Sequence, residues 1–150
     1  GPDSAGTAIR LRGEGNDHIL VSNVVEHAGA QPLLCLDVDT SEAGYQVIDH
    51  NQCHGTLTPP RWTEAFEQLD AWQTSSGFDL NSTVAAPGFA NPSTGDLSAS
   101  GPEADMIDAG HPALSSILDH FGQPRAAAPD RGAFEWSDSM LFSSGFESQP

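Results

Sequence analysis

Lysine is absent from this chain of 150 residues, and the five basic residues, all arginine, stand against 21 acidic ones. The formal net charge is therefore −16 at pH 7. So acidic a chain repels phosphates and anionic lipid head groups, which makes nucleic acid and membrane surfaces poor candidate partners. Long hydrophobic runs are also missing, since none approaches the ~20 residues of a membrane-spanning helix. We expect no nucleic-acid partner and no membrane span.

Cysteine is scarce, because Cys35 and Cys53 are the only two. Two thiols cannot form a four-ligand zinc site alone, and they lack the C-x-x-C spacing of a redox motif. They form one disulfide if the protein is exported, or remain two buried thiols, and the composition leaves both readings open. A hydrophobic content of 37%, with 15 Gly and 11 Pro, indicates short strands, many turns and a thin core.

Strand patterns concentrate in the first third of the chain. Alternating apolar and charged residues, or short apolar runs between turn residues, predict strands at residues 7–13, 18–26, 33–38 and 45–53. The two strand–turn–strand units resemble each other at a spacing of about 25 to 28 residues. A repeat of this length without an intervening helix is typical of a β-solenoid, in which successive coils stack.

Stacking of the two units predicts specific neighbours. Ile9 would lie over Leu34 and Leu11 over Leu36, while Arg12 would form an exposed ion pair with Asp37. The side-chain amides of Asn23 and Asn51 would stack at a corner, and Cys53 would lie opposite Val25. In this register a Cys35–Cys53 bridge has to cross from one face to another.

One helix is predicted over residues 62–73. Its apolar face would consist of Trp62, Ala65, Phe66, Leu69 and Trp72, and Gly77 would follow its end. We expect this helix to cover the solenoid or to close its open end.

From residue 45 to residue 136, several short motifs follow one another in a characteristic order. They are Leu69-Asp-Ala-Trp-Gln73, Ser76-Gly77, Pro87-Gly-Phe89, Asn91-Pro92, Gly95-Asp96, Asp105-Met-Ile-Asp-Ala-Gly110, Gly122-Gln-Pro-Arg125 and Asp130-Arg-Gly-Ala-Phe-Glu-Trp136. This string resembles the C-terminal end of secreted bacterial right-handed parallel β-helix proteins, the pectate-lyase-like superfamily. The resemblance concerns architecture more than activity.

The resemblance implies an all-β fold, a right-handed parallel β-helix with a loop-rich cap and one short helix. Residues 1–55 would be the terminal coils, 56–136 the capping region and 137–150 a tail. The chain would be the last part of a longer bacterial protein, secreted or at the cell surface, whose upstream coils are a partner. Export would favour the Cys35–Cys53 disulfide.

The resemblance also implies an extracellular, carbohydrate-directed parent, polysaccharide lyase-like or epimerase-like, in which this segment is mainly structural and inactive alone. The alternative is a non-enzymatic surface, adhesion or glycan-binding solenoid. The −16 charge favours that alternative or a neutral glycan.

A lyase needs a base and a cation beside the uronate carboxylate. The candidates are Arg10, Arg12, His18, His27, His50 and His54. Of these, His27 and His54 could form a pair that acts as base or metal ligand. The two arginines could also clamp a uronate bidentately, and Trp62 could stack on a sugar ring. The alternatives are a solvated arginine face, histidines at polar corners and a tryptophan in the core of the cap.

Acidic side chains gather around one predicted turn. Asp37, Asp39 and Glu42 lie in or beside it, and Asp49 lies on the next strand. Carboxylate oxygens converging from a loop suit Ca²⁺, so they form a candidate calcium site. The alternative is a solvated acidic turn, because the ordered D-x-D-x-D-G spacing is missing.

Overall fold

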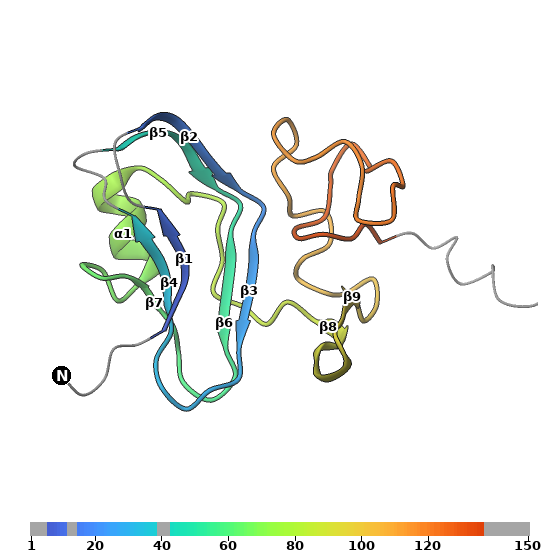
Figure 1. Cartoon of the computed structure of the whole chain (residues 1–150), viewed down its shortest axis with the longest axis horizontal. Helices are drawn as coiled ribbons and strands as arrows, with labels where there is room; N and C mark the ends of the chain where they lie inside the picture. The colour runs from blue at the N-terminus through green and yellow to red at the C-terminus, as the bar shows by residue number, and fades with distance from the viewer. Residues whose placement is uncertain (1–5, 12–14, 39–42, 137–150) are drawn as a thin grey trace, which may run out of the picture.

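A computed structural model describes residues 6–11, 15–38 and 43–136 of the chain. Six strands form two successive units of three (Figure 1). The first unit is β1 (Thr7–Leu11), β2 (Gly15–Val21) and β3 (Val24–His27), and the second is β4 (Leu34–Val38), β5 (Ala43–Asp49) and β6 (Gln52–Gly55). Each strand of the first unit pairs in parallel with its counterpart in the second. A short seventh strand, β7 (Arg61–Thr63), pairs with β4.

The predicted fold class, a right-handed parallel β-helix, is wrong. The described residues form four separate small sheets, three of two strands and one of three, together with one α-helix, and these sheets do not close into a solenoid. The segment that follows β6 explains why the strands do not continue into a solenoid. Two prolines, Pro59 and Pro60, precede β7 and lack the N–H groups that extend a ladder. After the three residues of β7 the chain turns into a helix, and Thr83 adds only an isolated bridge to Gln52.

Each of two longer predicted strands is divided by a sharp bend. Ser22 and His50 have left-handed backbone angles, with φ of 59° and 56°, at equivalent places in the two units. Asn23 and Asn51 follow these bends, and the Asn23 Nδ2 donates to Asn51 Oδ1 over 2.9 Å. The predicted stacking of these two amides is therefore confirmed.

The predicted register of the first ladder is wrong by two residues. Ile9 pairs with Leu36, whereas Leu34 pairs with Thr7. A shift of two residues keeps every side chain on the same face of the sheet, so the apolar pattern did not separate the two registers. Arg10 rather than Arg12 is consequently the partner of Asp37, and Arg12 lies outside the described residues.

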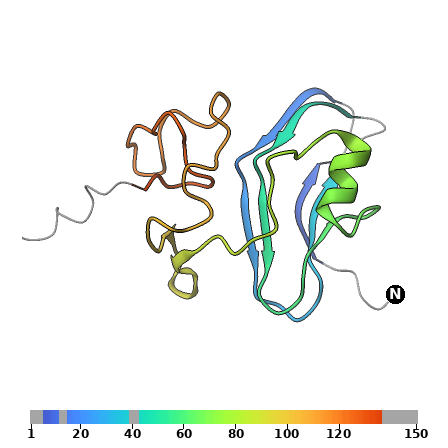
Figure 2. The same ribbon diagram turned by 180° about the vertical axis from the view of Figure 1, so that it is seen from behind.

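The helix α1 (Leu69–Ser76) begins seven residues later than predicted. Trp62 belongs to β7, and a turn follows it in which the Thr63 N–H donates to the Phe66 carbonyl over 2.9 Å. The helix ends at Ser76, three residues later than predicted, but Gly77 follows its end as predicted, with φ of 75° and an N–H that donates to the Gln73 carbonyl. Figure 2 shows α1 against the sheet that contains β7. Within the part of the chain that is described, no helix is long and apolar enough to cross a membrane.

The apolar core lies between these sheets and the helix. Its buried members are Leu20, Leu33, Cys35, Leu36, Ile48, Cys53, Trp62 and Trp72. Partly buried side chains from β1 and β3 and from the helical segment pack against it.

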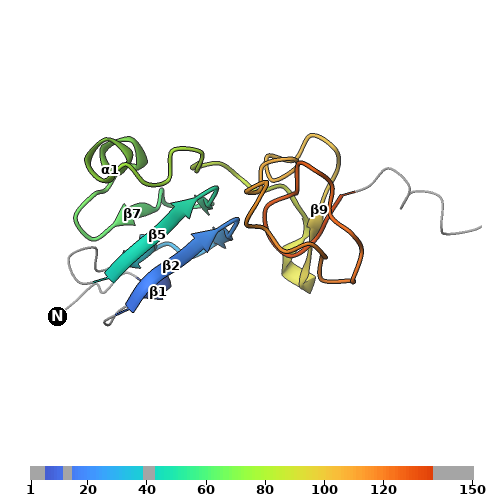
Figure 3. The same ribbon diagram turned by 90° about the horizontal axis from the view of Figure 1, so that it is seen from above.

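Residues 84–136 form a second, strand-poor region. Its regular structure is a hairpin of β8 (Phe89–Asn91) and β9 (Asp96–Ala99) with the 3₁₀ turn η1 (Pro92–Thr94) between them. Figure 3 shows the remaining loops beside the ends of β2 and β5. Ser22 joins the two regions, because its carbonyl accepts from the Gly132 N–H and its hydroxyl from the His111 N–H, both over 2.8 Å.

Candidate functional site

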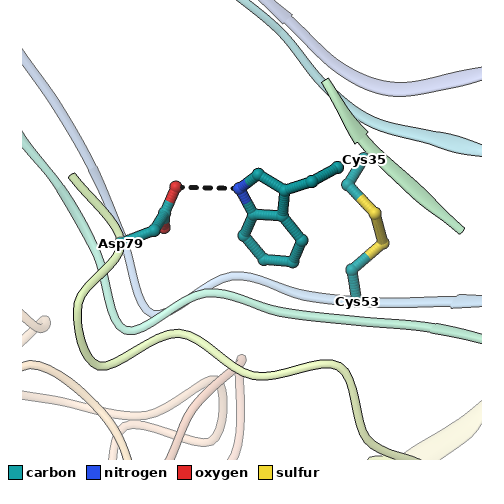
Figure 4. The surroundings of a disulfide bond; sticks show 4 residues. Cys35, Cys53 and Asp79 are labelled. Atoms are coloured by element: carbon teal, nitrogen blue, oxygen red, sulfur yellow. Dashed lines mark hydrogen bonds between the residues drawn. A yellow bond between two sulfur atoms is a disulfide. The ribbon is translucent and has the colours of Figure 1, made fainter. Parts of the chain in front are cut away.

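A disulfide links the two sheets that enclose the core. Cys35 of β4 and Cys53 of β6 are bonded, with their Cα atoms 6.2 Å apart, and both are buried (Figure 4). The predicted position of Cys53 opposite Val25 is confirmed, so the bridge does cross between sheets. Because both sulfur atoms are buried, this disulfide has a structural role.

Asp79 is a fully buried carboxylate, and an indole ring lies between it and the disulfide (Figure 4). It accepts hydrogen bonds from the indole N–H groups of Trp62 (3.1 Å) and Trp72 (2.9 Å), from Asn51 Nδ2 (3.0 Å) and from the Ser82 hydroxyl (2.5 Å). Because both carboxylate oxygens are engaged by these four donors, we assign Asp79 a structural role in the core.

Trp62, predicted as a sugar platform, is only 1% exposed. Its ring belongs to the core, which is the alternative that the sequence left open. The sequence did not single out Asp79. The available signal was the need of two buried indole N–H groups for a partner.

Arg10 is the one predicted arginine that the described residues include. Its Nε donates to Asp37 Oδ2 over 2.7 Å, and the Arg10 side chain is 64% exposed whereas that of Asp37 is 7% exposed. The guanidinium therefore already has a carboxylate partner from the neighbouring strand. Arg12, the second arginine predicted to bind a uronate, lies outside the described residues.

The two predicted histidines are not brought together as a pair. In the β3–β6 ladder His27 pairs with Gly55, whereas His54 pairs with Glu26, the residue before His27. Neighbouring residues of a strand point to opposite faces, so His27 and His54 belong to different faces. His27 Nε2 lies 3.0 Å from the Gln31 carbonyl, and His54 Nδ1 lies 3.6 Å from a Glu26 carboxylate oxygen.

The candidate calcium ligands are only partly described, since Asp39 and Glu42 fall outside the described ranges. Asp37 pairs with Arg10, and Asp49 accepts two hydrogen bonds from Asn81, each over 2.8 Å. Among the residues that are described, no three His, Cys, Asp or Glu side chains converge as metal ligands. Asp37 and Asp49 are thus held by protein donors.

A corner between the two regions holds two imidazoles. The ring centroids of His50 and His111 are 4.8 Å apart, and His50 Nδ1 lies 3.3 Å from an Asp49 oxygen. Burial lowers the pKa of His50, Asp49 opposes this, and the neighbouring His111 and Arg131 lower the pKa further. Burial would raise the pKa of Asp49, but hydrogen bonds from Asn81 and His50 outweigh it and lower that pKa. Protonation of His50 would therefore place a positive charge near Arg131.

An open groove of about 680 Å³ lies between the first strand unit and the hairpin. Figure 1 shows the hairpin β8–β9 beside β3 and β6. The apolar lining of the groove includes Val24 and Val25 of β3, and Phe89 and Leu97 of the hairpin. Its polar groups come from Glu26, Thr56 and Ser93. A volume of roughly 300–1,000 Å³ is usual for a small-molecule site. We therefore regard this groove as the candidate functional site.

No known protein family, curated protein or solved structure matches this chain.

Proposed function

We propose that this chain is a non-catalytic, carbohydrate-binding module of an exported bacterial protein, and that the groove between β3 and the β8–β9 hairpin takes a neutral glycan. The observation that carries the proposal is the composition of the groove. Apolar side chains, among them the aromatic ring of Phe89, line the groove together with the polar residues Glu26, Thr56 and Ser93. Sugar rings present C–H faces to apolar walls and hydroxyl groups to such acceptors.

The charge of the chain supports a neutral rather than an acidic glycan. At −16, the protein repels uronate polymers over distances of about a Debye length. Glu26 adds a carboxylate to the lining of the groove itself. A neutral sugar avoids this repulsion and still donates hydroxyl hydrogen bonds to the carboxylate.

The disulfide supports export, since such bonds persist mainly in oxidising compartments. A binding role is favoured over a lyase by the fate of the predicted catalytic groups. Arg10, His27 and His54 each face a protein group rather than a shared opening. A general base has to lie within hydrogen-bond reach of the proton that it removes.

The test is retention of the whole chain on a panel of neutral and acidic polysaccharides. We expect retention on a neutral glycan, and a loss of affinity of roughly three- to tenfold in Phe89→Ala, the size of one lost aromatic contact. The matched control is Ile117→Ala, which removes an exposed apolar side chain outside the groove and leaves binding unchanged. Release of ultraviolet-absorbing unsaturated uronate would establish a lyase and overturn the proposal, and so would the lack of retention on every neutral glycan.

A further inference from the structure

A second, smaller cavity lies in the strand-poor region, apart from the groove. Its volume is about 80 Å³, well above the roughly 10–15 Å³ that one water molecule needs. Three aromatic residues, Phe121, Phe134 and Trp136, line it together with the carboxylates of Asp130 and Glu135. The rings of Phe121 and Phe134 are 5.1 Å apart and tilted by 43°, so they form a wedge rather than a stack.

The surroundings of this cavity carry an excess of negative charge. Asp130 and Glu135 are buried, and Asp108 and Asp119 each contact one of them, through the hydrogen bonds Asp108 N to Asp130 Oδ1 and Glu135 N to Asp119 Oδ2. Among the described residues, Arg125 is a cation of this cluster, and its Nη1 lies 3.0 Å from Glu135 Oε2. The surroundings therefore favour a positively charged occupant.

The raised pKa of Asp130 is consistent with this excess of negative charge. Burial raises the pKa of Asp130, backbone hydrogen bonds from Asp108 and Trp136 oppose the rise, and the charges of Glu135 and Asp108 raise the pKa further.

The hydrogen bonds inside the cluster restrict what kind of cation fits. The oxygens of Asp130 accept from the backbone N–H groups of Asp108 and Trp136. Those of Glu135 accept from the Ala126 N–H on one side, and from Arg125 and the Asp130 N–H on the other. All four oxygens thus already accept a hydrogen bond from the protein. A cation without N–H groups therefore loses least on entering, because it has no hydrogen bonds to water that the cavity would have to replace.

We propose that this cavity binds a quaternary ammonium group, held by the faces of the aromatic rings and by the surrounding carboxylates. Aromatic faces attract a cation within about 6 Å of the ring centroid, and quaternary ammonium groups are recognised in this way. The methyl groups of such a cation pack against Phe121, Phe134 and Trp136. The carboxylates supply charge without a direct hydrogen bond.

The test is a nuclear magnetic resonance titration of the whole chain, with the Trp136 indole as the reporter. Choline is compared with its neutral isostere 3,3-dimethylbutan-1-ol, and tetramethylammonium with methylammonium. We expect choline to bind roughly two- to thirtyfold more tightly than the isostere, the range of a cation–π contribution. Tetramethylammonium should bind more tightly than methylammonium.

Two substitutions at one exposed ring separate the π contribution from apolar contact. Phe121 is 63% exposed, so its replacement should leave the fold intact, which the melting temperature checks. Phe121→Leu should weaken choline binding and leave the isostere unchanged, and Phe121→Ala should weaken both. Ile117→Ala is the control without effect.

The proposal is overturned if choline and the isostere bind alike, because the cavity then recognises apolar shape alone. Tighter binding of methylammonium would show that hydrogen bonds select the ligand, and would overturn the quaternary class. The lack of any shift with tens of millimolar choline would also overturn it.

Discussion

The two regions of this molecule are held together in different ways. Residues 6–83 have parallel strand ladders, a mainly apolar core and a disulfide. In residues 84–136 the buried groups include Asp119, Asp130, Arg131 and Glu135, and side chains bond directly to loop backbone. Where ladders are lacking, charged side chains satisfy the backbone instead. Apolar substitutions and reduction should therefore damage the first region, and loss of a charge should damage the second.

The largest effect should come from Asp79, the fully buried carboxylate of the first region. Asp79→Ala leaves two indole N–H groups, an amide and a hydroxyl without their acceptor. We expect a loss of more than about 4 kcal/mol in the free energy of unfolding, because each unpaired buried group costs roughly 1–3 kcal/mol. Urea unfolding followed by tryptophan fluorescence measures it. Asp96→Ala, at the exposed start of β9, is the control, and an equal loss there would contradict the role of Asp79.

In the second region, Arg125→Gln should have the next largest effect. Arg125 bonds to Glu135 and to the carbonyls of Asp130, Gly132 and Phe134. The substitution leaves the Glu135 carboxylate buried without its cation, which costs roughly 3–5 kcal/mol. Hydrogen exchange should show faster exchange at residues 104–136 and little change in the β4 ladder. Uniform acceleration throughout the chain would mean that the two regions unfold as one unit.

Reduction of the disulfide should act on the first region. The bond joins cysteines 18 residues apart, and closing a loop of that length contributes about 3 kcal/mol through the entropy of the unfolded chain. The unfolding midpoint in urea, with and without reductant, measures the loss. The double variant Cys35→Ala/Cys53→Ala should show no reductant dependence, and a remaining dependence would contradict the assignment.

A smaller effect should appear with pH at the corner that joins the regions. The pKa of His50 is lowered in the folded state, so the unfolded chain binds a proton first as the pH falls. Stability should be complete above about pH 6.5 and decline as the pH falls from there toward the folded-state pKa. Thermal unfolding between pH 8 and pH 5 tests this. His50→Asn, which tolerates the left-handed backbone, should reduce the decline in this interval.

The smallest effect should be that of Arg10→Gln. Arg10 is mostly exposed, and exposed ion pairs contribute at most about 1 kcal/mol. The change in the unfolding midpoint should vanish in high salt. A larger change would show that Asp37, which is buried on its side of the pair, depends on Arg10.

Local patterns predicted much of the first region. The strand positions, the Asn23–Asn51 contact and the helix end at Gly77 follow from alternation, repeat spacing and turn residues. The register was not predictable, because a shift of two residues preserves the same apolar face. The helix start was misplaced because the spacing of Trp62 fits a helix as well as the strand that it occupies.

The second region and the sites were less predictable. The contacts of Arg125 and Asp130 bring together loop segments whose approach no local periodicity encodes. Most of the motifs behind the resemblance to pectate-lyase-like proteins lie in this region. The resemblance remains a prediction, although the fold class that it implied is wrong. Neither the groove nor the aromatic cavity was predicted, since each combines residues from distant parts of the chain.

The covalent link between β4 and β6 has a consequence for proteolysis. Any single peptide-bond cleavage between Leu36 and Gln52 leaves both fragments attached through sulfur. The nicked molecule would migrate as one species under non-reducing denaturing electrophoresis and separate into two only after a thiol is added. The chain can thus be cut between β4 and β6 and keep its two parts at a fixed stoichiometry.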